Sequence, residues 1–353
     1  MYFLFVGIVF FAYFFLGEVC KKRTKRDRIF MIVSFSILVF LQWFKDISIY
    51  PDIEGYEQVF DRMYALQNAN EIIPLLGGYE IGWVFLNYMF TRITDSFDIF
   101  LRFIYFVTCA GYCFGIYKLS KSPLFSILFT MLYHSAFAMS FFVLKQNLAC
   151  SVAFVAFFFI IKESKWKYIV LILLATLFHY AAIVLLPCYW LCKKFERGIS
   201  LKTLIMFLLL LFVFSIGYRY VTSLFSDKYG SYAEEGGNLL PFLLTSFIAI
   251  LSLKNLRPHR KNLVVNPSEL CLNQTISAIA VYSALICLSI LGTKMDRLAL
   301  FSTWFLTFTI PNAVTYRHSV FKYSIYALYL LISLYLIFSG DSPELVTHYH
   351  FIF

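Results

Sequence analysis

The chain has 353 residues, of which 61% are hydrophobic and only 14% are charged. A soluble domain of this length needs more polar surface, so the composition excludes a soluble globular protein and indicates one that crosses a membrane several times. In a soluble protein the formal net charge of +10 would suggest a nucleic-acid partner. Here the basic residues gather in short segments between apolar runs, as in cytoplasmic loops, so we expect no nucleic acid.

The apolar runs predict an all-α, polytopic membrane protein with about ten spanning helices. We see no boundary that divides the chain, so a single transmembrane domain over residues 1–353 is expected. The first run precedes a basic cluster, the reverse of the order in a signal peptide, which predicts a retained helix with an outside N-terminus. The expected spans are 1–17, 29–44, 98–117, 123–140, 143–161, 201–217, 239–253, 270–292, 298–316 and 322–339.

Two segments between residues 45 and 97 are expected to lie on the outer membrane surface as amphipathic helices. The run 79–93 is shorter than the roughly 20 residues that a bilayer crossing needs. The segment that follows Pro51 also divides into an apolar and a polar face. The apolar face of that segment holds Ile53, Tyr56, Phe60 and Met63, whereas the stripe shared in 79–93 is Glu80, Val84, Asn87 and Thr91.

The run 168–191 is long enough to cross, but His179 interrupts it at the middle. Basic loops at 162–167 and 193–202 flank it, so both of its ends should lie on the cytoplasmic side. We therefore expect a re-entrant or deeply kinked hairpin with His179 at its tip, covered by protein or water. If the run instead crosses the membrane, every later loop changes sides.

With both ambiguous runs treated as non-crossing, the predicted topology separates the basic residues. The cytoplasmic segments carry 21 of the 30 Lys and Arg, which agrees with the positive-inside rule. These segments are 20–28, 118–122, 162–167, 193–202, 254–261 and 317–322.

Polar side chains that this topology brings to the outer face are candidates for chemistry, since polar groups at a membrane need partners or water. Cations can hold a diphosphate leaving group, and a carboxylate or histidine can take a proton from a sugar hydroxyl. This set suits a reaction on an anionic lipid carrier. Its members are Asp52, Glu80, Lys145, Gln146, Arg219, Lys228, Asp296 and Arg297, with His179 reaching them from below and Tyr229 as a stacking surface for a sugar ring.

Each candidate also has a structural interpretation. His179 could be a neutral histidine bonded to a helix carbonyl, and Lys145 could extend to the outer interface. Arg297 could anchor lipid headgroups, and Asp52 and Glu80 could be ordinary acidic loop residues. The histidines show no metal-binding spacing, and no glycine-rich nucleotide motif occurs, so we expect neither a metal nor a cofactor.

The order of these motifs resembles the EpsG family, relatives of the Wzy-type polymerases of bacterial surface polysaccharides. The resemblance covers nearly the whole chain and lies in short motifs that are individually weak. The motifs are Asp52 with Tyr56, Gly78-Tyr79-Glu80-Ile81-Gly82, Lys145-Gln146-Asn147-Leu148-Ala149, Leu177-Phe178-His179, Lys228-Tyr229 with Tyr232, and Asp296-Arg297.

The resemblance implies a GT-C-like fold and a glycosyltransferase in the bacterial inner (cytoplasmic) membrane. Such an enzyme makes exopolysaccharide on the outer face by polymerising undecaprenyl-diphosphate-linked repeat units, without a metal. Membrane lipid and other polysaccharide export proteins are further candidate partners. Carried over to this sequence, Lys145 and Arg297 would bind diphosphate, Gln146 would orient a substrate, and His179 or Asp52 would be the base. The family usually has arginine at the position of Lys145, and lysine binds phosphate as a point charge instead of bidentately.

Two other classes fit the composition. A flippase of lipid-linked oligosaccharide should show paired half-repeats with broken helices at matching places. The sequence shows one break, near His179, and no counterpart. A membrane acyltransferase would use His179 as its base and draw its acyl donor from the cytoplasm.

Overall fold

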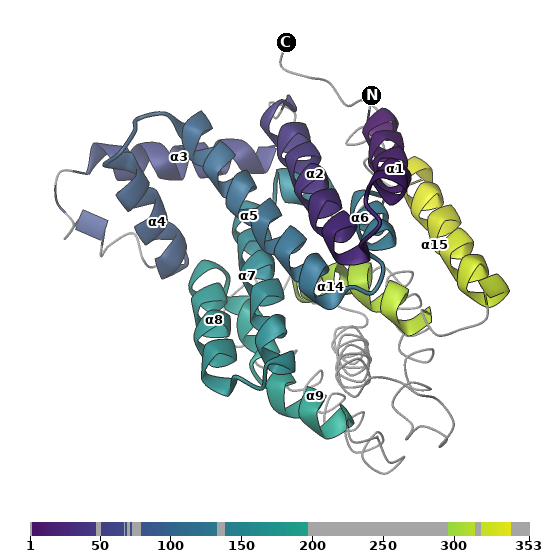
Figure 1. Cartoon of the computed structure of the whole chain (residues 1–353). Coiled ribbons are helices and arrows are strands. Elements are labelled where there is room, and N and C mark those ends of the chain that lie inside the picture. Colours follow the sequence, from purple (N-terminus) through teal and green to yellow (C-terminus); the bar gives the residue numbers. More distant parts are fainter. Residues whose placement is uncertain are drawn as a thin grey trace.

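The computed structural model describes residues 2–46, 51–66, 68, 71–72, 79–132, 138–196, 296–314 and 319–339. Within these residues the chain is helical and contains no strand (Figure 1). The predicted spans 201–217, 239–253 and 270–292 lie outside the described residues. The helices are α1 (Tyr2–Val19), α2 (Arg23–Trp43), α3 (Pro51–Ala65), α4 (Ile81–Thr91), α5 (Phe97–Leu119), α6 (Pro123–Leu132), η2 (Ala138–Phe141), α7 (Leu144–Ile161), α8 (Lys165–Phe178), η3 (Tyr180–Leu185), α9 (Cys188–Glu196), α14 (Asp296–Val314) and α15 (Ser319–Ser339).

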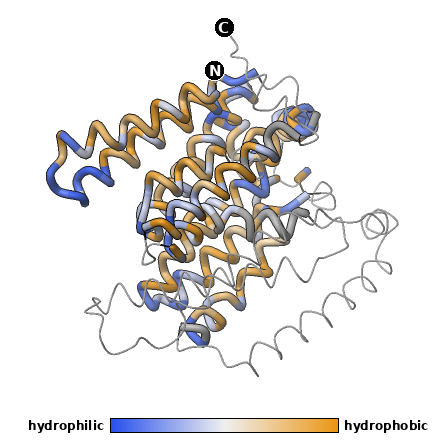
Figure 2. Tube along the Cα trace, turned by 90° about the vertical axis from the view of Figure 1, so that its right-hand side faces the viewer, coloured by the Kyte–Doolittle hydropathy of each residue, from blue (hydrophilic) through white to orange (hydrophobic). Residues whose placement is uncertain are grey.

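Three of the described helices, α1, α5 and α7, are long and apolar enough to cross a membrane. Apolar residues extend along most of the helix lengths in Figure 2, and hydrophilic residues lie mainly near helix ends. The predicted spans 1–17, 98–117 and 143–161 therefore correspond to suitable helices, and the chain is a membrane protein.

The predicted span 123–140 is not one continuous helix. α6 is described over Pro123–Leu132, and residues 138–141 form the 3-10 helix η2 instead of α-helix. The amide of Asn147 explains part of this path, because its Nδ2 donates to the carbonyls of Met139 (3.0 Å) and Val143 (2.8 Å). The segment before α7 is thus held in a shape that is not α-helical.

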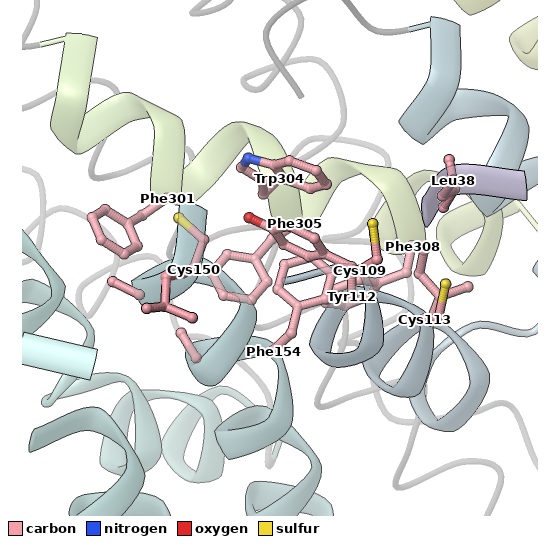
Figure 3. Packing of buried hydrophobic residues seen from close by; sticks show 14 of the residues in the cluster. Leu38, Cys109, Tyr112, Cys113, Cys150, Phe154, Phe301, Trp304, Phe305 and Phe308 are labelled. Atoms are coloured by element: carbon pink, nitrogen blue, oxygen red, sulfur yellow. The ribbon is translucent and has the colours of Figure 1, made fainter. Parts of the chain in front are cut away.

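The centre of the bundle is an aromatic layer between α5, α7 and α14 (Figure 3). The rings of Tyr112 and Trp304 stack with their centroids 3.6 Å apart, and Phe154 stacks on Phe305 at 4.9 Å. α5 meets α7 closely at Gly111, where a Cβ atom would lie 2.8 Å from the Cβ of Ser151. Small residues at such contacts let helix backbones approach in membranes.

The basic segments of the described chain gather at one end of the bundle, which we call the basic end. Arg23 donates to the carbonyl of Lys121 at 2.7 Å, joining segments 20–28 and 118–122. Lys193 forms an ion pair of 2.7 Å with Glu163. Asn312 near the end of α14 donates to the carbonyl of Leu119 at 2.6 Å, so α14 also ends here. The predicted common side of these basic segments is confirmed as a relative placement, and which side faces the cytoplasm stays a prediction.

The opposite end is built where α2 ends and α5 and α7 begin. The indole of Trp43 donates to the carbonyl of Arg102 at 2.9 Å. Gln42 donates to the hydroxyl of Ser140 in η2 at 2.5 Å, and the hydroxyl of Tyr105 donates to the carbonyl of Phe141 at 2.7 Å. These contacts fix η2, and hence the start of α7, at the end opposite the basic segments.

The path of the predicted hairpin at 168–191 is confirmed, whereas its entry into the membrane from the cytoplasmic side stays a prediction. α8 ends at Phe178, His179 is extended with φ −154° and ψ 115°, and η3 begins at the next residue. The chain then returns along α8, because the hydroxyl of Tyr168 donates to the carbonyl of Leu185 at 2.5 Å. Lys165 also lies over the ring of Trp190 at 5.2 Å. His179 is therefore at the tip, and both arms lead back to the basic end.

The two predicted amphipathic helices, α3 and α4, form with the expected division of faces. α3 buries Ile53, Val59, Phe60 and Met63, and it runs crosswise to α2 and α5 in Figure 1. α4 buries the stripe that contains Val84, Asn87 and Thr91. The guanidinium of Arg92 closes the pair by donating to the carbonyl of Met63 at 2.9 Å. Their placement at a membrane surface stays a prediction.

Candidate functional site

A partly buried ion pair joins two of the predicted site residues. Lys145 Nζ lies 2.6 Å from Glu80 Oε2, and the two side chains are only 19% and 10% exposed. The ammonium also lies 5.7 Å from the centre of the Tyr79 ring. Lys145 is thus turned toward Glu80 and not simply extended to the interface. Removing two charges from water is costly, which makes this pair a candidate for function.

A close helix contact places this pair beside the hairpin tip. α4 begins at Ile81 and meets the last turn of α8 at Gly82. A Cβ atom on Gly82 would lie 2.7 Å from both the Cβ and the carbonyl oxygen of Leu177, so only glycine fits without displacement. The predicted motifs around Glu80 and His179, far apart in sequence, are therefore in direct contact.

His179 has a defined hydrogen-bond role in this arrangement. Its Nδ1 accepts from the backbone N–H of Ala181 at 3.3 Å, and its ring centre lies 6.0 Å from that of Phe301. A neutral imidazole that accepts at Nδ1 carries its proton on Nε2. In this conformation the neutral ring has its N–H donor at Nε2. At Nδ1 the ring accepts from a backbone N–H and does not donate to a helix carbonyl.

α14 brings the Asp296-Arg297 motif to the same end of the bundle. Arg297 lies one helical turn before Phe301, which contacts His179. From there α14 runs through the bundle to Asn312 at the basic end. The backbone of the motif therefore starts near the hairpin tip, while the side chain of Arg297 lies outside the described part of the structure.

Gln146 and Asn147 follow Lys145 but face into the bundle, since each is 1% exposed. Besides its two bonds to backbone carbonyls, Asn147 accepts from the hydroxyl of Tyr112 at 3.2 Å through its Oδ1. Asn147 thus fixes the turn of helix that carries Lys145. Sequence analysis named Asn147 only as part of the Lys145-Gln146-Asn147-Leu148-Ala149 motif, and its place in that motif is the signal that points to it.

Lys45 is a second cation at this end that was not among the predicted site residues. It follows α2, is 2% exposed, and has its Nζ 5.2 Å from the ring centre of Phe141 in η2. Burial lowers its pKa to about 8, and the charge of Asp46 partly opposes this shift. A lysine directly after a predicted span is normally interpreted as an interfacial anchor. The sequence therefore did not indicate that Lys45 is buried.

Three predicted site residues are not brought into this cluster by the described structure. Asp52 lies in the first turn of α3 and is exposed, on the side away from the buried face. No hydrogen bond or ion pair among the described residues joins it to Glu80, Lys145 or His179. Arg219 and Tyr229 lie outside the described residues.

Two helix N-termini add to the electrostatics of the cluster. Glu80 is the residue before α4 and Lys145 is in the first turn of α7, and neither helix has a side-chain cap. The positive end of a helix dipole favours anions. The cluster therefore combines a cation, two uncapped helix starts, an imidazole donor and a carboxylate, a set that can hold an anionic group and accept a proton nearby.

Comparisons with known proteins identify the family of the chain. A search of curated proteins and a search of solved structures each found no match. The model of the EpsG family matches residues 27–351, a stretch that includes Glu80, Lys145, His179 and the start of α14. The match spans nearly the whole chain, so the protein belongs to the EpsG family.

Proposed function

We propose that the protein is a polysaccharide polymerase that transfers a growing glycan from a lipid diphosphate to an incoming lipid-linked repeat unit. The observation that carries the proposal is the partly buried Glu80–Lys145 pair beside His179, at the end opposite the basic segments. Membership of the EpsG family supports a polymerase-type role. The positive-inside rule supports an outward-facing site, because the basic end would face the cytoplasm.

The reaction is a glycosyl transfer with inversion at the anomeric carbon. A hydroxyl of the incoming repeat attacks that carbon, and the bond to the diphosphate oxygen breaks. Negative charge develops on the leaving diphosphate, and cations placed there lower the barrier. Lys145 and Arg297 would supply them, with Arg219 as a further candidate, while Tyr229 would position a sugar.

The donor substrate would be an undecaprenyl-diphosphate-linked oligosaccharide in the outer leaflet of a bacterial inner membrane. The diphosphate is itself the leaving group, so the reaction uses no nucleotide and no metal in this proposal. A GT-C-like arrangement of the helices belongs to the same proposal, as do contacts with other export proteins.

The test is complementation of a deletion strain with His179→Ala and Arg297→Ala variants. Both should lose long polymer and accumulate single lipid-linked repeats on the outer leaflet. Asp61→Ala, on the exposed face of α3, is the control and should restore polymer. Wild-type polymer in both variants would refute the site, and repeats held on the inner leaflet of the deletion strain would instead indicate a flippase.

A further inference from the structure

We propose that Glu80 is the general base of this reaction, and that the donor's diphosphate activates it by drawing Lys145 away from its carboxylate. This inference rests on the proposed polymerase function and names the residue that takes the proton. It also assigns a second task to the Glu80–Lys145 pair, as a contact that exists before substrate arrives and opens when it binds.

The geometry favours Glu80 over the two residues that the sequence suggested as base. Asp52 is exposed on α3, with no described bond to the cluster. His179 accepts from Ala181 at Nδ1, which leaves the proton of the neutral ring on Nε2. The one lone pair of the neutral ring lies on Nδ1, which already accepts this bond. Nε2 therefore has no lone pair with which to take a proton from a hydroxyl. His179 is therefore placed to donate to an oxygen of the diphosphate.

Glu80 has the properties that its rivals lack. A carboxylate has only acceptor oxygens, and this one is held in the protein, 10% exposed, within reach of the cation that is proposed to bind the leaving group. Gly82 and Leu177 fix the start of α4 against the hairpin tip, so Glu80 cannot drift from His179 without moving a helix. Base and leaving-group ligands are thus positioned by the same contact.

The ion pair also explains how proton transfer could depend on the donor. At 2.6 Å the ammonium of Lys145 occupies Oε2 of Glu80. A diphosphate carries more negative charge than a carboxylate, so it competes for the same ammonium. When Lys145 turns to the diphosphate, the lone pairs of Oε2 become open to the hydroxyl of the acceptor.

The transfer then moves one proton and one electron pair. The acceptor hydroxyl oxygen forms a bond to the anomeric carbon while its proton passes to Glu80. The bond between that carbon and the diphosphate oxygen breaks, and its electron pair leaves with the lipid diphosphate. Lys145 and the Nε2–H of His179 bind the oxygens that gain charge. Glu80 returns its proton to water after the lipid diphosphate leaves and Lys145 swings back.

The experiment uses the purified full chain in proteoliposomes. Turnover is the release of lipid diphosphate from the lipid-linked repeat isolated from the deletion strain, and binding is measured with undecaprenyl diphosphate alone. Glu80→Gln should lower turnover by at least about 100-fold, the typical size of a general-base contribution. Its affinity for undecaprenyl diphosphate should be unchanged or several-fold tighter, because no carboxylate competes for Lys145.

The matched controls separate this role from a structural one. Glu57→Gln makes the same chemical change on the exposed face of α3 and should alter neither quantity. Lys145→Gln should weaken binding of undecaprenyl diphosphate. If Glu80→Gln does not fold, Glu80→Asp retains the charge with a shorter reach and should lower turnover without weakening binding.

Two results would overturn the inference. Turnover of Glu80→Gln within a few-fold of wild type would show that another group takes the proton. Binding and turnover that fall together in the folded variant would make Glu80 a structural partner of Lys145. Both results differ from failure of the proposed function itself, in which the wild-type chain would release no lipid diphosphate.

Discussion

α3 and α4 are neighbouring amphipathic helices that turn opposite faces toward the protein. α3 buries its apolar face and exposes Glu54, Gln58 and Asp61. α4 buries a stripe with Asn87 and Thr91 and exposes Ile81, Phe85 and Met89. Glu80, directly before α4, is buried as well.

This contrast indicates a different surrounding for each helix at the end opposite the basic segments. A helix with its polar face outward suits water, which fits α3. No described contact joins the acidic residues of α3 to the site. An apolar face turned outward suits lipid, and the polar stripe of α4 is then available to the protein interior. The inverted orientation of α4 is what carries Glu80 to Lys145.

The largest expected effect is the difference between two glycine-to-alanine substitutions, one on α4 and one on α3. Gly82→Ala would place a Cβ atom 2.7 Å from the backbone of Leu177, so α4 must move away from the hairpin tip. We expect a loss of about 1–3 kcal/mol in the free energy of unfolding, with polymer formation strongly reduced. Gly55→Ala, where nothing lies within 4 Å, should be neutral or stabilise α3 by about 0.5–1 kcal/mol. Unfolding of the two variants in detergent would compare them, and equal losses would refute the close contact.

A lysine placed on the outward face of each helix gives the next largest effect. Phe85 is 59% exposed on α4, and Phe85→Lys would set a charge against lipid. We expect a cost of about 1 kcal/mol, because α4 is predicted to lie near the interface and not at the bilayer centre. Gln58→Lys on the outward face of α3 should change stability by less than about 0.5 kcal/mol. Thermal unfolding in nanodiscs would measure both, and a tolerant Phe85→Lys would mean that α4 faces water.

The third effect concerns pH and Lys45, which follows α2. Burial holds the pKa of Lys45 at about 8 in the folded chain, whereas an unfolded lysine titrates near its usual value, about 10.4. Between these values the unfolded chain binds more protons, so stability should rise as pH increases from about 8 to about 10.

Lys45→Gln should lose this rise, while Arg62→Gln on the exposed face of α3 should keep it. Melting temperatures measured across that pH range would show the difference. A pH profile of Lys45→Gln that matches wild type would mean that the amine is not the titrating group.

The sequence predicted best the features that depend on local periodicity and on the distribution of charge. The hairpin at 168–191 follows from a histidine inside an apolar run with basic loops on both sides. The faces of α3 follow from helical spacing. Periodicity in α4 identified its polar stripe but not that the stripe faces inward, because in a membrane either face of an amphipathic helix can be covered.

The parts that sequence could not predict depend on contacts between distant segments. The bond between Glu80 and Lys145 joins residues 65 positions apart. The non-α-helical path just before α7 depends on a side chain further along, Asn147, that binds the backbone carbonyls of Met139 and Val143. The burial of Lys45 depends on η2, most of whose residues the sequence assigned to the continuous span 123–140.

We propose that these residues form a site where one lipid-linked repeat is joined to another. The most direct measurement supplies proteoliposomes of the wild-type chain with the lipid-linked repeat alone, without nucleotide sugar. We expect lipid-bound products of two or more repeats, with one undecaprenyl diphosphate released for each new glycosidic bond. Repeats that stay single, or that only move between leaflets, would contradict the account.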